Sequence, residues 1–160
     1  MKRFLSGLCF FLLLDTAMAQ KGAVVKKFNP AERPRNLSDS ALLDLVQQQT
    51  FKYFWDYGHP VSGLAGERSN SGAETVTSGG SGFGIMAIPV AISRGFITRA
   101  AGLTRMQTIV SFLKNTAQKF HGAFPHWLNG TTGAVIPFSS KDDGADLVET
   151  SYLVAGLLTA

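Results

Sequence analysis

The chain contains the stretch Asp142-Asp143-Gly144-Ala145-Asp146-Leu147-Val148-Glu149-Thr150, in which four carboxylates fall within eight residues at the start of an apolar segment. At about 100° per residue, a helix would place Asp142, Asp146 and Glu149 on one face. The apolar residues that follow would point away from that face. We therefore expect an acidic face on a helix whose other sides are apolar.

This acidic stretch has two physical interpretations. Carboxylates on neighbouring turns raise one another's pKa, which can produce an acid that keeps its proton near neutral pH, as acid/base cleavage of a glycoside requires. Acidic residues are also common in the first turn of any helix, because they bind exposed N–H groups and favour the positive end of the dipole. That dipole lowers the pKa of the same groups. The residues alone leave the catalytic and the capping interpretations open.

Residues 1–19 have the pattern of a secretory signal peptide. A basic start, Lys2-Arg3, precedes an apolar run too short to span a bilayer, and Ala17-Met18-Ala19 offers a small-x-small cleavage site. The single cysteine, Cys9, lies inside this segment, so the processed chain would have no disulfide. We expect a periplasmic or secreted bacterial protein that is not membrane-bound after signal removal, with residues 20–37 as a flexible leader.

The charge pattern and the last residues define the remaining organisation. The formal net charge of +4 comes from dispersed residues without a basic stripe of interleaved aromatics, so nucleic acid is not an expected partner. Residues 151–160 are mostly apolar and have no C-cap or polar tail. Because an uncovered apolar helix end is unfavourable in a finished domain, we expect residues 38–160 to be the N-terminal part of a longer domain.

Hydrophobic periodicity predicts an all-α fold with about four helices. The expected helices begin at Ser38 or Asp39, at about Phe83, after the cap Thr98, and at the acidic stretch. A Gly- and Ser-rich loop covers residues 61–82, and Asn129-Gly130 indicates a possible short hairpin within residues 121–141. There is little room for a larger sheet.

The predicted helices alternate in character along the chain. The first and third are amphipathic, whereas the second and fourth are apolar nearly all round. This alternation suits a two-layer ring, in which inner helices are covered on both sides and outer helices on one. The Gly-rich loop and the acidic stretch both precede inner-type helices, so we expect them at the same mouth of the ring.

The loops at this mouth favour a sugar over a metal or a cofactor. The glycines of residues 79–84 lack the Lys-Ser/Thr pair and the preceding strand of a phosphate-binding loop, so they more readily allow backbone to approach a ligand or a neighbouring helix. His121 and His126 lack a familiar zinc spacing. Trp127 could cover the C–H face of a sugar while His126 and Asn129 bond its hydroxyls, although Trp127 could equally be a core residue.

Several motifs together resemble the bacterial glucoamylase-like family, which includes endo-β-1,2-glucanases. The similarity covers roughly residues 38–160 and is carried by Tyr53-Phe54-Trp55, residues 63–70, Gly79-Gly80-Ser81-Gly82-Phe83-Gly84-Ile85, His121-Gly122-Ala123-Phe124-Pro125-His126-Trp127-Leu128-Asn129-Gly130, and residues 141–150 followed by Gly156-Leu157-Leu158. The resemblance implies a six-hairpin α/α toroid, of which this chain would supply part.

The same resemblance implies an exported glycoside hydrolase that cleaves β-glucan, with β-1,2-glucan favoured, by inversion with a carboxylate acid/base pair. Position by position, it implies Asp142, Asp146 and Glu149 as the catalytic residues, without deciding which is the proton donor. The implied sugar-contacting residues are Arg68, Ser81, His126, Trp127, Asn129 and Asp143. The partner would be an oligo- or polysaccharide, and no cofactor is implied. The alternative is a non-catalytic carbohydrate-binding or structural helical module.

Overall fold

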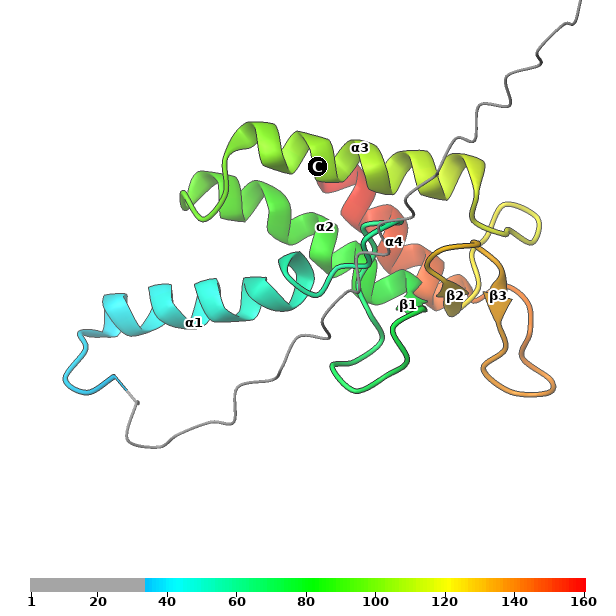
Figure 1. The fold of residues 1–160 in the computed structure, drawn as a ribbon, viewed down its shortest axis with the longest axis horizontal. Helices are drawn as coiled ribbons and strands as arrows, with labels where there is room; N and C mark the ends of the chain where they lie inside the picture. The colour runs from blue at the N-terminus through cyan, green and yellow to red at the C-terminus, as the bar shows by residue number, and fades with distance from the viewer. Residues whose placement is uncertain (1–33) are drawn as a thin grey trace, which may run out of the picture. The chain divides into compact units, whose positions relative to one another are not determined.

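Four α-helices and one small antiparallel sheet form the computed structural model, which describes residues 34–160 (Figure 1). In chain order the elements are α1 (Asp39–Trp55), β1 (Thr75–Thr77), α2 (Ser78–Ser93), α3 (Arg99–Asn115), β2 (Trp127–Asn129), β3 (Val135–Ile136) and α4 (Leu147–Thr159). The predicted signal peptide, and the predicted leader up to residue 33, lie outside the described residues. The predicted helix-rich class, with about four helices and a short hairpin, is confirmed.

Local capping fixes where three of the helices begin. The Ser38 hydroxyl accepts the Ala41 N–H at α1, and the Thr98 hydroxyl accepts the Ala101 N–H at α3. Asp146 caps α4 in the same way. Each cap satisfies one of the N–H groups that the first helical turn leaves without a partner. The predicted starts of α1 and α3 are therefore confirmed, because the capping signal lies within a few residues.

Helix α2 begins earlier than predicted, at Ser78 rather than near Phe83, and the Gly-rich segment is helical. Glycine costs about 1 kcal/mol relative to alanine inside a helix. Here the glycines let α4 approach, because a β-carbon on Gly82 would overlap the Tyr152 carbonyl and one on Gly156 would overlap the Gly82 backbone. The interpretation of these glycines as points of close helix approach is confirmed, and their interpretation as a loop is wrong.

Helix α2 is the central element of the fold and packs against α1, α3, α4 and β1 (Figure 1). The hydrophobic core gathers one or two buried residues from each surrounding element. It includes Ile85 and Ile88 of α2, Ile109 and Phe112 of α3, Leu153 of α4, Val76 of β1 and Leu128 of β2. Burial of these side chains holds the start of α2, the sheet and α4 in one unit.

The sheet has the order β1-β2-β3, and both pairings are antiparallel. The register pairs Val76 with Leu128 and Trp127 with Ile136. The predicted hairpin therefore exists, but its loop spans residues 130–134 instead of two residues. Asn129 accepts the backbone N–H groups of Thr131 and Thr132, which stabilises this longer turn.

The apolar helices α2 and α4 are not covered on both sides by the described residues. Large apolar side chains of both helices are exposed, namely Phe83, Val90, Leu147, Val148, Val154 and Leu158. The packing around α2 is thus that of part of a helical ring. Within the part of the chain that the structure describes, every helix is too short or too polar to cross a membrane.

Replacing Gly82 by alanine tests the contact between α2 and α4. The added methyl group would overlap the Tyr152 carbonyl, and moving backbone costs more than turning a side chain. We expect Gly82→Ala to lower the free energy of unfolding of the full-length protein by about 3 kcal/mol, measured by urea denaturation. Gly144→Ala is the matched control, because nothing lies within 4 Å of its β-carbon. Equal stability of the two variants would contradict the assigned contact.

Candidate active site

The N-terminal ends of α2 and α4 lie side by side, joined by the loop of residues 124–127. The Ser78 hydroxyl donates to the Pro125 carbonyl at 2.6 Å, and the Ser78 N–H donates to the His126 carbonyl at 3.1 Å. On the other side of the loop, the Asp146 N–H donates to the Phe124 carbonyl at 2.9 Å. The three segments predicted to meet at one mouth are therefore in contact.

Thr150 fixes the loop to the first turn of α4. Its hydroxyl accepts the Phe124 N–H at 2.9 Å and lies 3.1 Å from the Phe124 carbonyl, to which it donates. Together with the bond from Asp146, this satisfies both backbone groups of Phe124, which is buried. The position of the neighbouring His126 and Trp127 thus depends on α4.

Asp146 caps α4 and also pairs with a histidine. Its Oδ1 accepts the N–H groups of Val148 and Glu149 at 2.9 and 3.0 Å, and its Oδ2 lies 3.2 Å from His126 Nδ1. Burial acts to raise the pKa of the Asp146 carboxyl, but these N–H groups and the His126 ring outweigh it, so the pKa lies below its ordinary value. Asp146 is therefore ionised at neutral pH, and the expectation of a raised pKa is wrong for this residue.

Glu149 reaches from the first turn of α4 to the start of α2. Its Oε2 accepts the Gly79 N–H at 2.8 Å and lies 3.4 Å from the Thr77 hydroxyl. A β-carbon on Gly79 would overlap the Glu149 carboxylate, so only glycine leaves room for this contact. The carboxylate satisfies an N–H group at the N-terminus of α2 and ties the two helix ends together.

Asp142 and Asp143 lie before the helix, on an exposed turn. The backbone of Asp142 forms a bridge with Ser139, and α4 begins only at Leu147 because Asp146 takes the extended conformation of a cap. The prediction that Asp142 shares a helix face with Asp146 and Glu149 is therefore wrong. Neither the Asp142 nor the Asp143 carboxylate forms a hydrogen bond with another of the described residues.

Trp127 links this acidic site to a second polar group that the sequence did not indicate. Its Nε1 donates to Glu67 Oε2 at 2.7 Å, and Arg68 Nη2 donates to Glu67 Oε1 at 2.8 Å. Glu67, Arg68 and Trp127 border an open hollow of about 290 Å³, which is also lined by Asn70, Ser71, Thr75 and Ile136. A single glutamate in a Gly- and Ser-rich loop carries no sequence signal, so Glu67 emerges only from its partners.

Three aromatic rings stand between the two polar groups. The ring centroids of Trp127 lie 5.3 Å from His126 and 4.8 Å from Phe138, and those of His126 and Phe138 lie 4.8 Å apart. Such separations are typical of favourable aromatic pairs. Trp127 is only half-buried, so part of its ring remains available to a ligand.

Two of the predicted sugar-contacting residues are engaged in the fold itself. Ser81 is buried, and its hydroxyl donates to the Thr77 carbonyl at 2.5 Å and accepts the Ala65 N–H at 2.9 Å. Asn129 uses its amide oxygen in the hairpin loop described above. Ser81 therefore shapes the mouth by holding the Ala65 backbone rather than by facing solvent.

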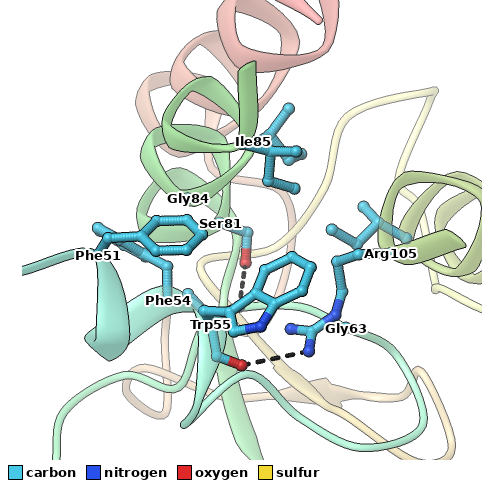
Figure 2. Close-up of a pocket in the computed structure, with 11 residues that line it drawn as sticks. Phe51, Phe54, Trp55, Gly63, Ser81, Gly84, Ile85 and Arg105 are labelled. Atoms are coloured by element: carbon cyan, nitrogen blue, oxygen red, sulfur yellow. Dashed lines mark hydrogen bonds between the residues drawn. The ribbon is translucent and has the colours of Figure 1, made fainter. Parts of the chain in front are cut away.

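A separate cavity between α1, α2 and α3 is too small for a sugar (Figure 2). Its volume is about 10 Å³, the space of a single water. The Arg105 guanidinium lies 4.5 Å above the Trp55 ring and donates to the Trp55 carbonyl at 3.2 Å, and burial lowers its pKa. This cavity is part of the core. Among residues 34–160, no group of three or more His, Cys, Asp or Glu side chains could hold a metal ion.

Comparison with known proteins identifies the relatives of this chain. An exo-β-1,2-glucooligosaccharide sophorohydrolase (non-reducing end) from Parabacteroides distasonis is 51% identical over 125 residues, which are 78% of this chain and 17% of that protein. A suspected glucoamylase from Bacteroides uniformis is 60% identical with a TM-score of 0.76, over 78% of this chain and 31% of that one. No protein-family model matches the chain.

A third relative has a sugar in its crystal structure. The endo-β-1,2-glucanase from Chitinophaga pinensis, in complex with sophorotriose and glucose, is 53% identical with a TM-score of 0.71, over 76% of this chain and 31% of that one. The chain is thus homologous over most of its length to glucoamylase-like proteins and β-1,2-glucan hydrolases, which confirms the predicted family and agrees with part of an α/α toroid. It spans 17% of the curated relative and 31% of these two solved chains.

Replacing Asp146 by asparagine separates its charge from its capping role, because an asparagine side chain also caps helices well. A carboxyl whose folded pKa lies below its unfolded value of about 3.9 stabilises the fold above that pH, and this contribution is lost as the pH falls through the folded pKa. We expect Asp146→Asn to be less stable than the wild type at pH 7 and to lose less stability below about pH 4. Urea denaturation from pH 2 to pH 7 measures both.

Asp143→Asn is the control for this titration, because Asp143 is exposed and without a partner among the described residues. Its stability should follow the wild-type curve at every pH. Parallel curves for Asp146→Asn and the wild type would contradict the assigned stabilisation of the Asp146 carboxylate.

Proposed function

We propose that the protein is a glycoside hydrolase that cleaves β-1,2-glucan and that this chain supplies part of its substrate site. One observation carries the proposal: the Asp146–His126 pair stands directly beside Trp127, whose ring borders an open hollow with charged side chains. The names of two homologues, which describe action on β-1,2-linked glucans, support the same substrate class.

The proposed reaction is inverting hydrolysis by two carboxyl groups. In this mechanism one carboxylic acid protonates the leaving oxygen and a carboxylate activates water on the other side of the sugar ring. Asp146 suits the role of an ionised group that orients His126 and stabilises positive charge on the sugar, because its pKa is lowered. The proton donor would then be Glu149 or Asp142, or a residue outside this chain.

The proposed sugar contacts come from both sides of the aromatic group. His126 and Trp127 would border the reacting sugar, while Arg68 would act at the hollow and Asp143 at the exposed turn before α4. Ser81 and Asn129 would act only by shaping the backbone around them, since their side chains are engaged there.

We also propose that the protein is exported with loss of residues 1–19, as its N-terminal pattern indicates. The protein purified from its native host should then begin at Gln20 in N-terminal sequencing. A mature protein that still carries Met1 would contradict this.

Glu149→Gln tests the catalytic assignment. Glutamine keeps an oxygen that can accept the Gly79 N–H, so the fold should be retained while the acid function is lost. We expect the full-length wild type to release short oligosaccharides from β-1,2-glucan, and Glu149→Gln to lower kcat by about 10²- to 10⁴-fold. Glu74→Gln is the control, because the exposed Glu74 only faces His59, with 3.6 Å between Oε2 and Nε2.

The outcomes separate the candidate functions. Full activity of Glu149→Gln would remove Glu149 from the mechanism and leave the hydrolase in place. Titration of the wild type with β-1,2-gluco-oligosaccharides that gives binding without products would instead favour the non-catalytic carbohydrate-binding module. Neither binding nor turnover would favour a structural module.

A further inference from the structure

Glu67 is a carboxylate held in one orientation at the edge of the hollow. Its two oxygens accept separate donors, Trp127 Nε1 at 2.7 Å and Arg68 Nη2 at 2.8 Å. Only 18% of the Glu67 side chain is exposed, against 60% for Arg68. The carboxylate is therefore fixed from the protein side, while the guanidinium beside it remains open to a ligand.

The backbone around Glu67 is anchored to two elements of the fold. The Glu67 N–H donates to the Thr75 carbonyl at 3.1 Å, and the Tyr53 hydroxyl of α1 donates to the Gly66 carbonyl at 2.8 Å. Burial, followed by the nearby Glu67 charge, raises the pKa of Tyr53, so its hydroxyl stays protonated as a donor. Such anchoring is what a preorganised binding group needs, because little freedom is lost when a ligand arrives.

The pair of side chains offers complementary groups to adjacent hydroxyls. A carboxylate has about four lone-pair positions, so each Glu67 oxygen can accept a further hydrogen bond, and a guanidinium has five N–H donors. Two neighbouring hydroxyls of a sugar can donate to Glu67 and accept from Arg68 at the same time. The hollow of about 290 Å³ lies at the lower end of ligand-site volumes and suits a single sugar unit.

The chemistry of glucans connects this pair to linkage. A β-1,2 linkage occupies O1 and O2, so every internal glucosyl unit keeps its 3- and 4-hydroxyls as an adjacent pair. A β-1,3 linkage occupies the 3-hydroxyl and a β-1,4 linkage occupies the 4-hydroxyl, so neither leaves that pair on an internal unit. A site that requires the 3,4-diol accepts β-1,2-glucan and rejects the other two.

We propose that Glu67 and Arg68 bind the 3,4-diol of one internal glucosyl unit in the hollow beside Trp127 and thereby select the β-1,2 linkage. This inference rests on the proposed function, since it names the linkage-reading residues of the same substrate site. Trp127 contributes to it by holding the Glu67 carboxylate through its Nε1.

The test uses Glu67→Gln in the full-length protein. Glutamine can still accept the Trp127 N–H but turns an amide toward Arg68 and loses the charge, so the diol loses its acceptor. We expect the dissociation constant and the KM for a β-1,2-linked glucopentaose to rise by about tenfold or more, with kcat changed by less than about threefold. Glu74→Gln, the same substitution outside the hollow, should match the wild type in both.

Two comparisons complete the experiment. The wild type should bind the β-1,2-linked glucopentaose at least about tenfold more tightly than the β-1,3- and β-1,4-linked pentaoses, and Glu67→Gln should reduce that preference. Arg68→Met changes an exposed side chain and should weaken binding in the same direction. This second variant replaces Glu67→Gln as the test if Glu67→Gln does not fold.

The results distinguish this inference from the function on which it rests. Normal affinity and KM in Glu67→Gln, or in Arg68→Met if Glu67→Gln does not fold, in an enzyme that cleaves β-1,2-glucan would overturn the linkage-reading role and leave the hydrolase intact. A wild type that neither binds nor cleaves β-1,2-glucan would overturn both.

Discussion

Close contact between the N-terminal half of α2 and α4 is the constraint on which the site depends. Gly82 and Gly156 allow the two backbones to touch, and Glu149 then spans the gap to the N–H of Gly79. Because the same first turn of α4 holds the loop with Phe124, the positions of His126 and Trp127 follow from this contact. A single helix–helix interface thus places both the acidic groups and the aromatic rings.

The capping groups have a second consequence for chemistry. Asp146 satisfies the first N–H groups of α4 with one oxygen and reaches His126 with the other, so the carboxylate that begins the helix also orients a ring. Capping and a functional role are therefore not alternatives for this residue. The donors that make Asp146 a good cap are the same donors that lower its pKa and keep it charged.

Local signals predicted the parts of the fold that local physics decides. Ser38 and Thr98 cap helices through bonds to residues three positions away, so the sequence was sufficient there. The helical start of α2 depends on α4, about 70 residues further on, and no window of sequence contains that partner. Glu67 depends in the same way on Trp127, 60 residues away, which is why the candidate site was predicted without it.

A crystal structure of full-length Glu149→Gln with a bound β-1,2-gluco-oligosaccharide tests most directly whether the joined ends of α2 and α4 form the substrate site. We expect electron density for the sugar between the Asp146–His126 pair and Trp127, with one glucosyl unit in the hollow beside Glu67 and Arg68. A sugar bound elsewhere on the protein, with the joined ends of α2 and α4 free of ligand, would contradict this assignment.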